Sequence, residues 1–396
     1  MPISTYPNDA ESAGMDAQAL QRIITSIEGD ISQGLIFGAT VLVARHGKIA
    51  LHQSIGTVAP GRNAKNDDLY LSMSLAKSFT AALTLRAIDQ GKFTLDTKVG
   101  KILPEFSTGG KKNITIFQLL CHQAGIYSKL VPPAPYKATD IINLEKMYQA
   151  VASQPVEYVP GERVCYAPFA GHAVCAKILT TLDSKKRSFA QIAADELFRP
   201  LAMIDTRYGS AESDLRRVDV SFTEKMTTPN SAATAQFLNQ LASEGAEMPA
   251  GGAYTTAIDT FRFAETLRRG GSNDSYRLMS HAMVEYASRN HCGDLTNDAW
   301  ISYCIEHDLP QLRANFSLLG GYSRGEGHHM VPTGQLASPK AYCAVGGGST
   351  MWMVDPDREL TVVFLSAGFI EGLAHSQRVS LINDLAVAAC LEPASS

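Results

Sequence analysis

The sequence lacks the long apolar runs that membrane-spanning proteins carry. No stretch approaches the ~20 consecutive apolar residues that a helix needs to cross a bilayer. The opening residues, MPISTYPNDAESAGMDAQAL, also lack the basic start and the apolar core of a signal peptide. We therefore expect a cytoplasmic protein without a membrane partner.

A strong excess of one charge is absent as well. Lys and Arg together number 35 against 39 Asp and Glu, which gives a formal net charge of −4. Such a chain offers no general electrostatic field for a phosphate backbone, so nucleic acid is not an expected partner. Paired C-x-x-C spacing is also missing, which argues against a disulfide framework and a zinc site. We expect reduced, mostly buried thiols at the seven cysteines, which are Cys121, Cys165, Cys175, Cys292, Cys304, Cys343 and Cys390.

What the sequence does contain is enough apolar material for a large core. Its 396 residues are 45% hydrophobic and 19% charged, which is typical of one or two globular domains. Residues 39–56 contain two β-rich runs that meet at a tight turn around Gly47. Residues 349–368 repeat this hairpin pattern, with a turn at 355–358. From about residue 373, apolar spacing predicts an amphipathic closing helix.

The middle of the chain differs from its ends because its patterns are mostly helical. Helices are predicted within residues 74–92, 115–125, 143–154, 170–182, 189–198 and 256–271. Strands at the two ends need each other to bury their faces. We therefore expect an α+β fold, an αβα sandwich in which an antiparallel sheet is flanked by terminal helices and carries a large, mostly helical insertion.

The expected domain boundaries follow from this arrangement. Residues 1–70 and 290–396 together are expected to form the sheet domain, and residues 71–289 a mostly helical domain. The active site is expected in the cleft between the two. The stretch 229–253, rich in Gly, Ser and Ala, is expected to be a long surface loop.

A candidate nucleophile opens the first central helix. Ser74-Leu75-Ala76-Lys77 is an S-x-x-K motif, and no other serine in the chain has a lysine three residues later. Positions i and i+3 share one face of a helix, so the Ser74 hydroxyl and the Lys77 amine can meet there. A serine needs a nearby base to become a nucleophile, and a lysine in apolar surroundings has its pKa lowered enough to help. Alone, such a short motif also fits an ordinary N-terminal serine beside a surface lysine.

Around this motif the sequence resembles the serine β-lactamase and penicillin-binding-protein superfamily, specifically its class C β-lactamase and esterase branch. Five further blocks are similar to blocks of that superfamily in the same order, and they lie at 87–106, 114–126, 160–174, 197–209 and 248–271. The resemblance covers most of the chain. It implies the same fold as the patterns above, and a covalent acyl-enzyme formed on Ser74 without a cofactor.

The resemblance also implies a second proton-carrying group, Tyr166. Class C relatives have a Tyr-x-Asn motif here, whereas this chain has Tyr166-Ala167-Pro168. A phenol titrates near 10, so Tyr166 needs the Lys77 ammonium nearby, or a concerted transfer in which it only relays the proton. Pro168 has no side-chain donor for a substrate amide carbonyl. This departure weakens a lactamase or peptidase interpretation.

A third implied element is the strand that borders the site. The family's Lys-Thr-Gly or His/Trp-x-Gly stretch corresponds here to residues 344–350, where neither lysine nor histidine stands. The strand supplies a backbone N–H that, with the N–H of Ser74, forms the oxyanion hole. We place that donor at Gly348, within one residue. Without the cation that holds a substrate carboxylate, an uncharged ester or thioester is the better substrate.

Several other residues were weighed. His122 is expected to be a satisfied structural histidine, and His328-His329 lacks further ligands for a metal site. Tyr127 and Trp352 are candidates for lining a substrate pocket, although ordinary packing explains each as well. The segment 290–340 matches the family least, and a substrate-specific lid is one interpretation of it.

These inferences together predict a serine hydrolase or acyltransferase acting on carboxylic esters or thioesters. Ser74, Lys77 and Tyr166 are its expected catalytic residues, and a small-molecule ester is its expected partner. If water accepts the acyl group, the enzyme is a carboxylesterase; if an alcohol or amine does, it is a transesterase of the kind found in secondary metabolism. A β-lactamase or D-amino-acid peptidase, and a non-catalytic binding or scaffold protein with the same fold, are the alternatives.

Overall fold

Strands from both ends of the chain pair in one antiparallel sheet. The computed structural model describes residues 9–210, 213–241, 243–328, 330–370 and 372–391. β1 and β11 lie side by side at its centre, in register from Gly38 opposite Ala367 to Arg45 opposite Leu360. The expected antiparallel sheet is therefore confirmed. Its seven strands in the described residues are, in order, β3 (Arg62–Asn63), β2 (Lys48–Ala59), β1 (Gly38–Arg45), β11 (Leu360–Ala367), β10 (Thr350–Asp355), β9 (Tyr342–Gly346) and β8 (Tyr322–Ser323).

Both expected hairpins are present. In the first, Arg45 faces Lys48, and the two turn residues His46 and Gly47 have φ angles of 53° and 76°. Two successive positive φ angles are typical of a type I′ turn, whose twist matches that of the flanking strands. The second hairpin joins β10 to β11 and closes where Asp355 pairs with Leu360.

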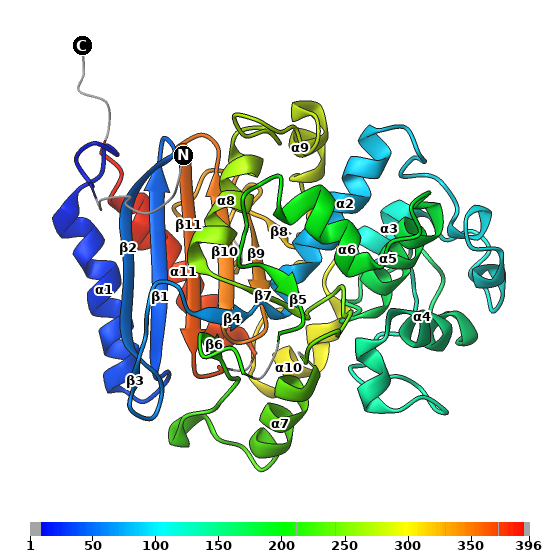
Figure 1. Cartoon of the computed structure of the whole chain (residues 1–396), viewed down its shortest axis with the longest axis horizontal. Coiled ribbons are helices and arrows are strands. Elements are labelled where there is room, and N and C mark those ends of the chain that lie inside the picture. The colour runs from blue at the N-terminus through cyan, green and yellow to red at the C-terminus, as the bar shows by residue number, and fades with distance from the viewer. Residues whose placement is uncertain (1–8, 211–212, 242, 329, 371, 392–396) are drawn as a thin grey trace.

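Helices cover both faces of this sheet, as Figure 1 shows. The terminal helices α1 (Ala17–Ser32) and α11 (Leu373–Ala388) pack on one face, where Ile23, Val41 and Val379 share one apolar core. Helix α8 (Ala257–Arg268) covers the opposite face. These layers are the αβα sandwich that the hydrophobic pattern predicts.

A second group of helices lies beside the sheet, and helix α2 (Ala76–Asp89) is one of them. Nearly every residue of α2 is buried, and its Phe79 packs edge-on against Phe198 and Phe263, with ring centroids 5.3 and 5.0 Å away. Burial on all sides makes α2 a rigid support for the residues at its N-terminus. Further helices beside the sheet are α3 (Ile116–Leu120), α4 (Leu144–Ser153), α5 (Ala170–Leu182), α6 (Phe189–Ala193), α9 (His281–Ala287) and α10 (Ile301–Glu306).

One expectation about the middle of the chain was wrong. Residues 229–253 are not one long loop, because Ser231–Leu241 forms helix α7. The alanine, glutamine and leucine in this stretch are strong helix formers, and their propensity outweighs the serine and glycine around them. The stretch then runs into a smaller sheet, whose strands in the described residues are, in order, β5 (Arg207–Tyr208), β7 (Ala253–Thr255), β4 (Leu69–Leu71) and β6 (Arg217–Val218).

The division into a sheet domain and a helical domain stays a prediction. Helix α8 belongs to the expected helical segment by sequence, yet it packs directly on strands β10 and β11. All seven cysteines fall within the described residues, and none of them is joined in a disulfide bond there. Within the same residues, the structure contains no helix that is both long and apolar enough to cross a membrane.

The position of Trp352 allows a first test. Its side chain is fully buried between the rings of Phe263 and Tyr342, so Trp352→Ala leaves a cavity. We expect the free energy of unfolding, measured by urea denaturation, to fall by about 3–5 kcal/mol. The other tryptophan, Trp300, is only half-buried, and Trp300→Ala should cost much less. If Trp352→Ala and Trp300→Ala lower the free energy of unfolding equally, the placement of Trp352 in the core is contradicted.

Candidate active site

A strained turn presents Ser74 between β4 and α2. Met73 has a φ angle of 51°, which is uncommon for any residue other than glycine. Residues Met73–Leu75 form a single 3-10 turn that continues directly into α2. Ser74 is therefore half-buried at the N-terminal end of a buried helix, where free N–H groups and the positive end of the helix dipole favour negative charge.

The structure brings Ser74, Lys77 and Tyr166 together. The Lys77 Nζ donates a hydrogen bond to the Ser74 Oγ at 2.9 Å, and the Tyr166 hydroxyl lies 2.7 Å from the same oxygen. The ammonium is also 5.0 Å from the centroid of the Tyr166 ring. One hydroxyl thus has two groups within hydrogen-bond distance that can carry its proton, which is the geometry that an activated serine requires.

Burial sets the protonation of Lys77. Its side chain is 1% exposed, and its other hydrogen-bond acceptor is the Ala250 carbonyl, 3.1 Å away. Removal from water lowers the pKa of Lys77, and nearby Tyr166 only partly offsets this effect. A lysine with a lowered pKa has a larger share of neutral amine near pH 7, so it is a better proton acceptor than a surface lysine.

His122 is a buried structural neighbour of the site rather than a charged member of it. Its Nδ1 accepts a hydrogen bond from the Ala167 N–H at 3.1 Å, and its ring centroid lies 4.7 Å from that of Tyr166. Burial, followed by the charge of Lys77, lowers the pKa of His122 to about 3. The ring is neutral at physiological pH, as expected for a satisfied histidine, and it packs against the Tyr166 ring.

Tyr166 is held by the segment around residue 297. The Asn297 Oδ1 accepts hydrogen bonds from the backbone N–H groups of Tyr166, at 3.1 Å, and Ala299, at 3.2 Å. The Phe316 ring stacks with the Tyr166 ring, with the ring centroids 6.1 Å apart. The phenol is therefore fixed by residues from the segment 290–340, which sequence reasoning described only as a candidate lid.

The turn between β9 and β10 lies directly against the Ser74 turn. A Cβ on Gly346 would collide with the Ser72 carbonyl, and the Thr350 hydroxyl donates to that carbonyl at 2.7 Å. Gly347 is exposed and faces Met73, with 3.6 Å between its Cβ position and the Met73 Cε. Gly348, the donor expected from sequence, is instead buried under Phe369 with a φ angle of 75°. Of the two, Gly347 is open to a bound substrate.

Two side chains of α11 hold this turn from behind. The Arg378 Nη2 donates to the Gly348 carbonyl at 3.2 Å and lies 2.6 Å from the Nδ1 of His375. The His375 Nε2 donates in turn to the Thr350 carbonyl at 3.1 Å. Burial lowers the pKa of Arg378 to about 10 and that of His375 well below its usual value. A buried cation therefore stands behind the glycine turn, although the strand itself carries none.

Of the two candidates for lining a substrate pocket, Tyr127 stays a prediction, whereas Trp352 was wrong. The Tyr127 hydroxyl donates to the Val131 carbonyl at 2.6 Å, within its own loop. Trp352 is fully buried in the core and does not line a substrate cavity, because its side chain points into the layer under α8. An apolar residue beside a glycine turn gives no sign, from sequence, of which face of the strand it occupies.

Sequence reasoning missed Ala250, Asn297, His375 and Arg378. Ala250 acts through its backbone carbonyl, which any residue supplies, so no residue type could have marked it. Asn297 precedes a short helical turn, and an asparagine there is typical of a cap, but nothing local connects it to Tyr166. For His375 and Arg378, the available signal was that two ionisable residues stand three positions apart on one predicted helix.

No site for a metal ion is apparent in this part of the molecule. Within the described ranges, no three His, Cys, Asp or Glu side chains gather where an ion could bind. His329, from the adjacent pair considered above, lies outside the described residues.

Comparison with known proteins identifies the family of this chain. Residues 11–384 match the Beta-lactamase family, and the chain therefore belongs to that family. Among curated relatives, Esterase EstB of Burkholderia gladioli is 25% identical over 295 residues, which cover 66% of this chain and 73% of the esterase. Protein flp of Staphylococcus aureus (strain MW2) is 26% identical over 219 residues, covering 53% of this chain and 42% of the staphylococcal protein. The chain thus spans less than half of the length of that relative.

Solved structures show the same fold at low sequence identity. A family VIII carboxylesterase superposes with a TM-score of 0.75 at 20% identity, covering 94% of this chain and 99% of the other. EstCE1, described as a hydrolase with promiscuous acyltransferase activity, gives a TM-score of 0.73 at 20% identity over 93% of this chain and 99% of its own. A penicillin-binding-protein homologue from Caulobacter crescentus gives 0.74 at 20% identity over 94% and 99%. These likenesses establish the fold.

The glycine turn yields a second prediction. Gly348→Ala places a Cβ 2.6 Å from the Phe369 ring on a backbone with positive φ, so unfolding should become easier by about 1–3 kcal/mol. Gly347→Ala, the matched control, brings its Cβ only into ordinary contact, 3.6 Å from the Met73 Cε and the Phe369 Cζ, and should leave the urea midpoint nearly unchanged. If the control is the more destabilised of the two, the turn does not have this conformation.

Proposed function

We propose that this chain is a serine hydrolase that cleaves uncharged carboxylic esters through an acyl-enzyme on Ser74. The observation that carries the proposal is the pair of short contacts on one hydroxyl, 2.9 Å to the Lys77 Nζ and 2.7 Å to the Tyr166 hydroxyl. Family membership and the resemblance to Esterase EstB support the same reaction class.

In the acylation step, the Ser74 Oγ attacks the ester carbonyl carbon. As the new Oγ–C bond forms, the serine proton passes to Lys77 and Tyr166. Collapse of the tetrahedral intermediate breaks the bond between carbon and the alcohol oxygen, and the same two groups return the proton to the departing alcohol. Water then attacks the acyl-enzyme by the reverse route and releases the acid. A second alcohol in place of water makes the reaction a transesterification.

Two backbone N–H groups stabilise the oxyanion in this proposal. The first belongs to Ser74 at the start of α2, and the second to the turn between β9 and β10. Within that turn we assign the donor to Gly347, one residue before the position expected from sequence, because Gly347 is exposed and Gly348 is buried. Pre-aligned donors of this kind are each worth about 10²–10³ in turnover.

The absent family residues favour a neutral substrate. Pro168 replaces an asparagine, and residues 344–350 contain no lysine or histidine to hold a substrate carboxylate. A β-lactam or a C-terminal peptide would leave its carboxylate without that partner. An uncharged ester has no carboxylate that needs a partner, so the absence of these residues does not lower its binding free energy.

Burst kinetics test the nucleophile. With p-nitrophenyl acetate we expect a burst of p-nitrophenol that matches the enzyme concentration and is lost in Ser74→Ala. Ser78→Ala is the matched control, because Ser78 is buried one turn further along the same helix and its hydroxyl makes no hydrogen bond. Unchanged turnover in Ser74→Ala, or rapid hydrolysis of nitrocefin by the unaltered enzyme, would contradict the proposal.

The protonation of Lys77 predicts the pH dependence of acylation. The amine accepts the serine proton only when neutral, so the acylation rate should fall as the pH falls and Lys77 gains a proton. Because burial lowers the pKa of Lys77, the midpoint of this limb should lie below the ~10.4 of a free lysine.

Stopped-flow measurement of the burst across pH gives this midpoint. Lys77→Met should lower the acylation rate by about 10²–10⁴ and remove the limb, whereas Lys92→Met, at an exposed position just after the same helix, should retain both. A limb that persists in Lys77→Met would mean that another group is the base.

A further inference from the structure

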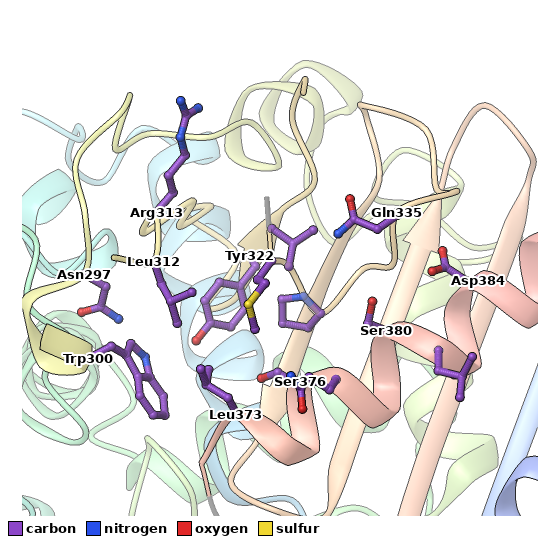
Figure 2. Close-up of a pocket in the computed structure, with 15 residues that line it drawn as sticks. Asn297, Trp300, Leu312, Arg313, Tyr322, Gln335, Leu373, Ser376, Ser380 and Asp384 are labelled. Atoms are coloured by element: carbon purple, nitrogen blue, oxygen red, sulfur yellow. The ribbon is translucent and has the colours of Figure 1, made fainter. Parts of the chain in front are cut away.

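A groove of about 260 Å³ lies beside the catalytic tyrosine, at the β8 edge of the large sheet. One wall is the outer flank of α11, which contributes Leu373 and Ser376. The opposite wall comes from the segment 297–335, with Trp300 and Tyr322 directed into the same space (Figure 2). The groove is therefore built between the closing helix and the segment that resembles the family least.

Two groups of the lining connect the groove to Tyr166. Asn297 holds the Tyr166 backbone through the 3.1 Å hydrogen bond described above. Tyr322 packs on Phe316, with ring centroids 5.1 Å apart, and Phe316 stacks on the Tyr166 ring. The groove thus begins on the side of the site where the phenol lies, and that phenol is the group that would protonate a departing alcohol.

The other end of the site reaches the same groove through α11. The Ile370 N–H donates to the Gly348 carbonyl at 3.1 Å, and Leu373, the first residue of α11, follows within three positions. A substrate carbonyl held at the glycine turn and a leaving oxygen held at Tyr166 would direct the alcohol part of the ester towards Leu373 and Tyr322. This places the groove on the leaving-group side of the scissile bond.

The walls of the groove expose more apolar than polar surface. Trp300, Leu312, Met330 and Leu373 are among the residues that line it, and 36% of Met330 remains exposed to solvent. An exposed apolar surface of this kind gains free energy when a ligand covers it.

The charged groups in the described part of the lining already have partners. Arg313 pairs with Asp294 at 3.0 Å, and Figure 2 shows it extending away from the centre of the groove. The Asp384 carboxylate, at the far end, accepts the Leu336 N–H at 2.7 Å. An anionic ligand therefore finds no free cation among the described lining residues, and the one carboxylate lies at the end of the groove away from Tyr322.

From these observations we infer that the groove binds the alcohol portion of the ester, and that this portion is a bulky, uncharged, aromatic or alicyclic group. A 150 Å³ apolar cavity accommodates one benzene ring, so about 260 Å³ suits a group of roughly two fused rings. This inference rests on the proposed function, since it assigns the leaving group of that same reaction.

Filling the groove tests the assignment. Ser376→Trp places a large side chain in it, and Ala388→Trp, at an exposed position three turns further along α11, is the matched control. We expect Ser376→Trp to lower the ratio of kcat/KM for 2-naphthyl acetate to that for ethyl acetate by about tenfold or more. The control should keep the ratio of the unaltered enzyme.

A second filling variant guards against misfolding of the first. Leu381→Trp acts at the half-exposed outer part of the groove and should lower the same ratio. Both variants are compared only after their thermal unfolding midpoints are shown to match that of the control.

Methyl 2-naphthoate, which carries its bulk on the acyl side, separates the remaining outcomes. If Ser376→Trp impairs this ester and spares 2-naphthyl acetate, the groove binds the acyl group and the inference is overturned. If Ser376→Trp still hydrolyses both naphthyl esters and its kcat/KM for each, relative to that for ethyl acetate, equals that of the unaltered enzyme, the groove binds no part of the ester. Absence of turnover and burst in the unaltered enzyme would instead overturn the proposed function, so the two failures are distinguishable.

Discussion

The contact between the buried Lys77 amine and the Ser74 hydroxyl is the interaction on which the rest of the site depends. A lysine in water is an ammonium and accepts no proton, so its use as a base requires that the fold remove it from water. Helix α2 does this because its neighbours cover it on nearly every side, and the Ala250 carbonyl then gives the amine an acceptor. The neutral rings of His122 and His172 lie nearby, where a second cation would be costly. The packing of the helical region therefore also lowers the pKa of Lys77.

The large sheet brings the other half of the site to this amine. The central pairing of β1 with β11 fixes β10 and β9 beside them, and β9 ends in the glycine turn that lies against Ser72 and Ser74. Glycine is required there because a side chain at Gly346 would occupy the space of the Ser72 carbonyl. Arg378, behind the turn, orients the Gly348 carbonyl through a hydrogen bond and brings a positive charge to the side of the site that lacks a strand lysine.

In the proposed reaction, the preference for one substrate over another depends on the residues that surround the reaction centre. The departures from the family, at Pro168 and along residues 344–350, remove groups that would hold an amide and a carboxylate. The segment 290–340 adds Asn297, which positions Tyr166, and Trp300 and Tyr322, which line the groove beside α11. One segment therefore connects the placement of a proton-carrying group with the size of the space beside it. Such coupling is a simple route by which a common fold acquires a particular substrate.

Local patterns in the sequence determined the two hairpins, the closing helix, the antiparallel sheet and the close approach of Ser74 to Lys77, because each depends on neighbours within a few residues or on a simple need to bury one face. Tyr166 was predicted from the resemblance of residues 160–174 to a block of the family, and not from any local pattern around the tyrosine itself. Only the tertiary structure decided which glycine of the turn is open, that Trp352 faces the core, and that Asn297 and Arg378 act on the site from distant segments. The physical reason is that a hydrogen bond between residues 131 positions apart, such as that of Asn297 with Tyr166, leaves no local trace in either stretch.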